Sequence, residues 1–161
     1  MVVGTGGEGF QDGAAAAAMF RSVSAMLHLP DGRVLVADQF NNRIRMLSAD
    51  LQQVSTVAGD GERGHQDGAA AQAQFSSPVD FALLPDGRVL VTDQNNHRIC
   101  VLSADLQQVS TVAGNGRWGG HRDGAAAQAQ FYRPRAFALL PDGRVLVTDE
   151  INHRVHTASA C

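Results

Sequence analysis

The sequence predicts an all-β fold built from near-duplicate sheets. Residues 29–36 recur without change at 84–91 and 140–147, at spacings of 55 and then 56 residues. Within each copy, short runs rich in Val, Leu and Thr alternate with Pro-Asp-Gly and Asn-rich turns, a pattern typical of strands. Segments repeated at such a period fold into similar units that pack against one another.

Each unit is expected to contain four short strands, which in the second copy cover 79–84, 88–92, 97–102 and 109–113. The run Val89-Leu90-Val91 is apolar throughout instead of alternating, so the sheet should be covered on both faces. Four-stranded blades arranged radially in a β-propeller supply that cover. In the linker, residues 67–73 are expected to form one helical turn with Asp67 as its N-cap.

The repeats divide the chain into three blades at approximately 20–59, 75–114 and 131–161. The third repeat has no fourth strand, whereas residues 1–4 match the end of a fourth strand and could complete a blade. Propellers have four to eight blades, so three are too few for a ring. Two interpretations stay open: the chain is half of a six-bladed homodimeric ring, or it is a piece of a longer multi-blade protein.

Composition excludes several classes of protein. The chain has 161 residues, sufficient for one domain, and a formal net charge of −3. All 13 basic residues are arginines, and this balance opposes a generally basic nucleic-acid binder. The two cysteines form neither a disulfide framework nor a zinc motif. With no visible signal peptide or membrane-length apolar run, we expect a cytoplasmic protein without a membrane partner.

Three turns carry a family resemblance that covers essentially the whole chain. Residues 93–99 (Asp-Gln-Asn-Asn-His-Arg-Ile) and 149–155 resemble the Asn-His-Leu signature of NHL-repeat β-propellers, and 38–44 matches with Asn42 in the place of His. The Val-Ala-Gly, Phe-x-x-Pro and Pro-Asp-Gly elements also recur in order. The resemblance implies a propeller scaffold. Similar propellers occur in RNA-binding regulators, in ubiquitin-ligase scaffolds and in metal-dependent lactonases and lyases.

The resemblance also suggests candidate ligands in a central channel. His97 and His153 occupy equivalent positions in two blades, and a related lyase family holds zinc through histidines near the axis. Asp80 replaces Ala25 and Ala136 in the strand nearest the channel and could bind Ca²⁺, Zn²⁺ or a polar ligand. The alternative is that the His positions satisfy turn backbone groups, which the repetition of the motif favours, and that Asp80 forms a local hydrogen bond.

The largest departure from the repeat lies before and within the third blade. Arginines and the chain's only Trp and only Tyr gather there, and we expect them on one rim beside the turns between second and third strands. Arginine and aromatic residues are enriched at protein interfaces. The sequence therefore favours a non-catalytic scaffold, without a cofactor, that binds a protein or peptide, with RNA binding or a metal-dependent enzyme as alternatives. The candidate partner-binding residues are Arg117, Trp118, His121, Arg122, Tyr132, Arg133 and Arg135.

Overall fold

The computed structural model describes residues 2–117 and 128–159, and the regular structure within them is almost entirely β. Within these ranges, single 3₁₀ turns lie at Ala15–Ala17, Gln39–Asn41, Ala70–Gln72 and Gln94–Asn96. No helix within these ranges has the length and apolarity needed to cross a membrane. The strands are β1 (Gly13–Ala14), β2 (Val23–His28), β3 (Val34–Asp38), β4 (Arg43–Leu47), β5 (Gln53–Ala58), β6 (Gly68–Ala69), β7 (Pro78–Leu83), β8 (Val89–Asp93), β9 (Arg98–Leu102), β10 (Gln108–Ala113), β11 (Pro134–Leu139), β12 (Arg144–Asp149) and β13 (Arg154–Ser159).

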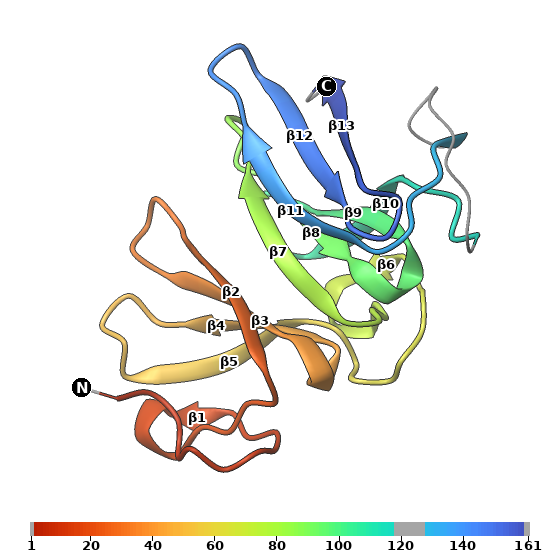
Figure 1. Ribbon diagram of the computed structural model, residues 1–161. Helices are drawn as coiled ribbons and strands as arrows, with labels where there is room; N and C mark the ends of the chain where they lie inside the picture. Colours follow the sequence, from red (N-terminus) through yellow and green to blue (C-terminus); the bar gives the residue numbers. More distant parts are fainter. Residues whose placement is uncertain (1, 118–127, 160–161) are drawn as a thin grey trace.

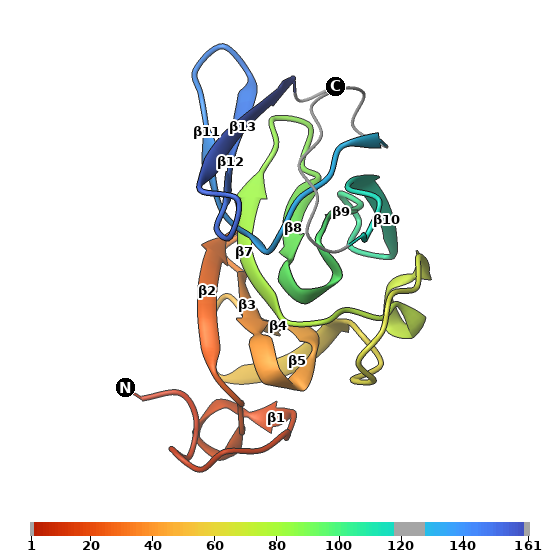
Figure 2. The same cartoon turned by 45° about the vertical axis from the view of Figure 1, so that its right-hand side comes forward.

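These strands form three antiparallel sheets, one per repeat (Figure 1). The strand orders are β1-β5-β4-β3-β2, β6-β10-β9-β8-β7 and β11-β12-β13. In Figure 2 the first strands of the repeats, β2, β7 and β11, lie next to one another, and the rest of each sheet extends away from them. This arrangement confirms the predicted all-β fold: the chain forms three blades of a partial β-propeller.

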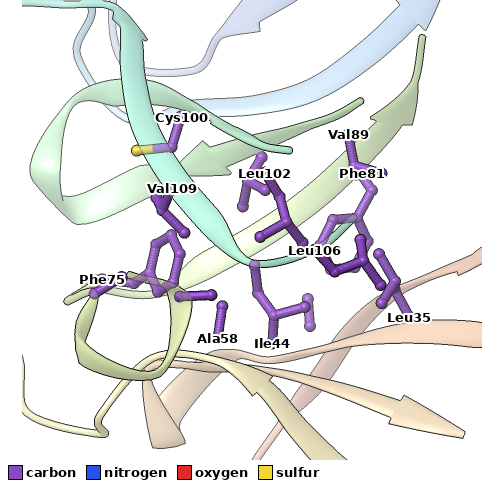
Figure 3. Close-up of a cluster of buried hydrophobic side chains, with 14 of the residues drawn as sticks. Leu35, Ile44, Ala58, Phe75, Phe81, Val89, Cys100, Leu102, Leu106 and Val109 are labelled. Carbon is purple, nitrogen blue, oxygen red and sulfur yellow. The ribbon is translucent and has the colours of Figure 1, made fainter. Parts of the chain in front are cut away.

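The cores lie between neighbouring sheets and not within any one of them. Figure 3 shows Leu35 and Ile44 of the first sheet facing Phe81 and Leu102 of the second, all of them buried. A second cluster joins the other face of the second sheet to Phe131 and its neighbours in the third repeat. The three residues 89–91 are at most 8% exposed, which confirms that the second sheet is covered on both faces.

The Pro-Asp-Gly turns fold as their residues require. Gly87 has a φ of 87°, a left-handed conformation that side chains disfavour. Asp86 accepts hydrogen bonds from the Arg88 N–H (3.1 Å) and from its guanidinium (2.7 Å), and these bonds hold the pKa of the Asp86 carboxyl below its usual value. Equivalent bonds occur in the other two repeats, so each turn carries its own stabilising pair.

One local expectation was wrong. Only Ala70–Gln72 is helical in the linker between the first two sheets, as a 3₁₀ turn, and its N-cap is Ala69 without a side-chain capping bond. Asp67 instead accepts hydrogen bonds from the Thr111 N–H (2.8 Å) and hydroxyl (3.0 Å) on β10. A partner distant in the chain therefore replaces the local cap, and Asp67 fixes the linker to the outer strand of its own sheet.

Candidate functional site

A buried aspartate organises the turn between the second and third strands of every sheet. Each carboxylate accepts a backbone N–H at 2.7 Å from the segment entering its sheet, and a side-chain N–H from the Asn three residues later. Such pairing of buried polar groups is what a repeated scaffold position requires. The three aspartates are Asp38, Asp93 and Asp149, and their Asn partners are Asn41, Asn96 and Asn152.

The residue after these turns joins one sheet to the next. Asn42 and His97 both take the left-handed conformation, with φ of 53° and 57°. The Oδ1 atom of Asn42 accepts the Ser77 N–H, and Nδ1 of His97 accepts the Arg133 N–H, both at 3.1 Å. We call each of these two hydrogen bonds a blade latch. Burial and the nearby Arg133 charge lower the pKa of His97, so the neutral ring needed to accept the bond is favoured.

The candidate channel ligands therefore separate. His97 is buried in a blade latch, and its ring packs edge-on against that of Tyr132 at 5.3 Å between centroids. His153 is exposed at the equivalent position of the third sheet. Within the described ranges, no three His, Cys, Asp or Glu side chains lie close enough together to hold a metal ion. Asp80, His97 and His153 are thus not brought together around one point.

Asp80 lines a pocket of about 390 Å³ at the start of the inner strands. The walls come from all three repeats, where β2, β7 and β11 meet the turns that follow β3 and β8. Asp80 Oδ2 also accepts the Phe137 N–H at 2.8 Å and so connects the second sheet to the third. The lining residues are Ser24, Gln39, Val79, Asp80, Gln94, Arg133, Arg135 and Ala136.

Two arginines of the third repeat are held at this pocket. Arg135 Nη1 contacts Glu150 Oε1 at 3.1 Å, and Arg133 Nη2 donates to Gln94 Oε1 at 3.2 Å. Gln94 Nε2 in turn donates to Glu150 Oε2 at 3.1 Å, which connects both arginines through one network. Arg133 Nε is buried and has no hydrogen-bond acceptor among the described residues. The network positions two guanidinium groups at the pocket.

Of the other candidate partner-binding residues, Arg117 and Tyr132 lie within the described ranges, and neither lines the pocket. The Tyr132 carbonyl accepts the Ile151 N–H (3.2 Å), so the segment entering the third sheet lies against the turn after β12. The same bond joins Arg21 to Phe40 and Ser76 to Asn95. Arg117 is exposed and does not line the pocket. The candidates Trp118, His121 and Arg122 lie outside the described residues.

Sequence reasoning placed Asp80 and the arginines in two separate sites, whereas the structure brings Asp80, Arg133 and Arg135 to one pocket. It also missed Glu150, which replaces the glutamine found at 39 and 94. The comparison between repeats that singled out Asp80 would have found Glu150 as well. Sequence could not show that these departures meet, because their contacts span two sheets.

The family model for the NHL repeat matches residues 75–102 and 131–157. The chain carries NHL repeats. Among curated proteins, this NHL-repeat chain is 34% identical over 104 residues to Protein SUPPRESSOR OF QUENCHING 1, chloroplastic, from Arabidopsis thaliana, covering 65% of the chain and 10% of that protein. It is 31% identical over 98 residues to human NHL repeat-containing protein 2, covering 61% of the chain and 13% of the relative. The NHL-repeat chain thus spans about a tenth of the length of these relatives.

Solved structures of low sequence identity share the fold. An auxiliary nutrient binding protein from Bacteroides thetaiotaomicron superposes with a TM-score of 0.71 at 20% identity, covering 82% of this chain and 36% of that one. A catalytically inactive virginiamycin B lyase from Staphylococcus aureus, solved with quinupristin, gives 0.58 at 14% identity, with coverages of 89% and 41%. At such identities the similarity extends to the blades and not to a shared activity.

Proposed function

We propose that the NHL-repeat chain is a non-catalytic scaffold whose pocket at the inner strands binds a protein or peptide partner. One observation carries the proposal: residues that depart from the repeat collect around the same pocket. Arg133 stands where the other repeats have Ser22 and Ser77, and Arg135 stands where they have Ser24 and Val79. The scaffold aspartates and their Asn partners, in contrast, are the same in all three repeats.

The chemistry of the pocket favours an acidic segment of the partner. Arg133 and Arg135 supply guanidinium groups, which bind carboxylates through paired hydrogen bonds. Glu150 and Gln94 hold these groups in place, so less side-chain freedom is lost when a ligand binds. Asp80 is already occupied by the Phe137 N–H and serves to fix the wall of the pocket.

A random peptide library displayed on phage and selected on the chain tests the proposal. We expect enrichment of peptides containing Asp or Glu, with affinities measured by calorimetry on the synthetic peptides. The double variant Arg133→Ser, Arg135→Val restores the residues of the second repeat and should weaken binding by at least about tenfold, because two charge-assisted contacts are lost.

Arg144→Ser is the matched control, because Arg144 is an exposed arginine of the third sheet, as Arg135 is, but pairs with Asp142 in a β-turn and does not line the pocket. It should leave the peptide affinity unchanged. Absence of enriched peptides, or equal binding by the double variant, would contradict the proposal. Salt-sensitive binding of a single-stranded RNA probe in place of peptides would support the nucleic-acid alternative.

A further inference from the structure

The two outermost sheets expose the residues that elsewhere join successive sheets. On the first sheet, Met26 is 68% exposed, whereas Phe81 at the same repeat position of the second sheet is 7% exposed, buried against the first. On the third sheet, Val155 is 61% exposed, whereas the equivalent Ile44 is fully buried. We call the surface containing Ser22, Val23 and Met26 the leading face, and the surface containing His153 and Val155 the trailing face.

The two faces carry complementary halves of a blade latch. In the existing latches, Asn42 and His97 accept the backbone N–H of Ser77 and Arg133. His153 occupies the acceptor position on the trailing face, and its φ of 54° matches that of the other two acceptors. Ser22 occupies the donor position on the leading face, with a φ of 63° against 58° for Ser77 and 63° for Arg133. The backbone geometry of both halves is therefore already formed.

Residues 2–3 also correspond to the strand that follows the third strand of a repeat, and β13 is the third strand of the last repeat and an edge of its sheet. The Gly4 N–H donates to the Ala15 carbonyl (2.8 Å) just as the Gly59 N–H donates to the Ala70 carbonyl (2.9 Å). Relative to the first sheet, residues 2–3 therefore occupy the position that residues 57–58, at the end of β5, occupy relative to the second sheet. In the first sheet Ile44 pairs with Ala58 across β4 and β5. By the repeat register, the corresponding pair is Val155 on β13 with Val3.

We propose that two copies of the 161-residue chain associate head to tail, with the trailing face of each seated on the leading face of the other. Both contacts repeat the interface that already joins one sheet to the next. Residues 2–3 of each copy then add a strand to β13 of the other, and His153 accepts the Ser22 N–H across the contact. Two copies supply six sheets, within the four to eight of known propellers, and the assembly closes on itself.

Size-exclusion chromatography with light scattering measures this association directly. We expect twice the 17.0 kDa of one chain for the unaltered protein. Val155→Asp should give a single chain, because it places a carboxylate in the apolar contact. Ser110→Asp adds the same charge at an exposed strand position away from both faces and should leave the mass doubled. A single-chain mass for the unaltered protein, or a ladder of higher multiples, would overturn the proposal.

A mixing experiment separates this contact from other kinds of dimer. Met26→Asp alters only the leading face and Val155→Asp only the trailing face, so each variant alone should be a single chain. Mixed together they should pair, because the trailing face of the first and the leading face of the second are both intact. Pairing of the mixture would exclude a self-complementary patch, because such a patch is altered in both chains and could not recover. Failure of the mixture to pair would contradict the head-to-tail contact.

The latch itself is tested at His153, whose side chain is exposed and whose replacement should not disturb folding. His153→Ala removes the acceptor and should raise the dimer dissociation constant by at least about tenfold. His153→Asn keeps an acceptor, as Asn42 does in the first latch, and should stay close to the unaltered value. Equal affinities for the two variants would show that this hydrogen bond takes no part in pairing.

Discussion

The first and second sheets both bury an aspartate, but they surround it with different side chains. Both bury an aspartate completely at the end of their second strand, Asp38 in one and Asp93 in the other. In the first sheet Arg45 lies beside this carboxylate with no exposed side-chain surface, and its Nη1 contacts Asp38 Oδ2 at 2.7 Å. Its Nη2 contacts Asp12 at 2.6 Å, and the guanidinium lies 5.0 Å from the centroid of the Phe20 ring.

In the second sheet the position of Arg45 is taken by Cys100, which is buried among the apolar residues facing the first sheet. Asp93 therefore lacks the contacting arginine that Asp38 has. Burial raises the pKa of Asp93 to about 7, despite hydrogen bonds from Asn96 and Ser76 and the nearby charge of Arg98. Burial likewise raises the pKa of the Cys100 thiol, with the nearby Asp93 adding to the effect. The same scaffold carboxylate therefore contacts an arginine in the first sheet, whereas in the second sheet it has hydrogen bonds without that contact and a raised pKa.

The largest effect is expected from removing the cation of the first sheet. Arg45→Met leaves Asp38 buried without its ion pair and should lower the free energy of unfolding by about 3–5 kcal/mol. Urea titration at pH 7 measures this change. Arg33→Met, which breaks an exposed pair with Asp31 in a turn, should cost far less, because solvent screens such pairs. A similar small loss for both variants would mean that the buried pair contributes no more than a surface one.

The second expected effect is a pH dependence that arises from Asp93. Its folded pKa of about 7 lies above the ordinary Asp pKa of 3.8, so between these values the folded chain binds more protons than the unfolded one. The contribution of Asp93 to stability is therefore largest below pH 4 and falls as pH rises toward 7, by at most about 1.4 kcal/mol per pH unit. Asp93→Asn should remove this fall when urea unfolding is compared at pH 5 and pH 8.

Cys100→Arg tests whether the missing arginine accounts for the raised pKa of Asp93. It would place a cation between Asp67 and Asp93, as Arg45 lies between Asp12 and Asp38. We expect the difference in stability between pH 5 and pH 8 to shrink to less than about half, since the charged carboxylate gains a partner. Cys100→Met, which adds bulk without charge, should keep the full difference. If the arginine and methionine variants behaved alike, the missing cation would not explain the raised pKa.

The smallest effects are expected at the latch between the first two sheets. Asn42→Ala removes the acceptor of the buried Ser77 N–H and should cost about 1–3 kcal/mol. Asn42→His restores the residue found in the other two repeats and should stay within about 0.5 kcal/mol of the original protein, since His97 makes the same bond. Thermal unfolding of the three proteins checks the order, and a histidine variant as weak as the alanine variant would show that the two latches are not equivalent.

Local signals sufficed for the elements of the fold because strands and turns depend on nearby residues. The strands predicted in the second repeat lie within one residue of β7 to β10, and the apolar run 89–91 is covered on both faces as expected. Asp67 shows the limit of such signals, because an acceptor that can cap the next turn can equally bind Thr111 on a strand more than 40 residues away.

By itself, the sequence determined the number of repeated units, their strands and turns, and which positions are common to all and which vary. Only the tertiary structure decided that Asp80, Arg133 and Arg135 share a pocket, that His97 joins two sheets, and that burial raises the pKa of Asp93. The physical reason is that strand alternation assigns a side chain to one face of its own sheet. What that face meets depends on how separate sheets pack, through contacts between residues far apart in the chain.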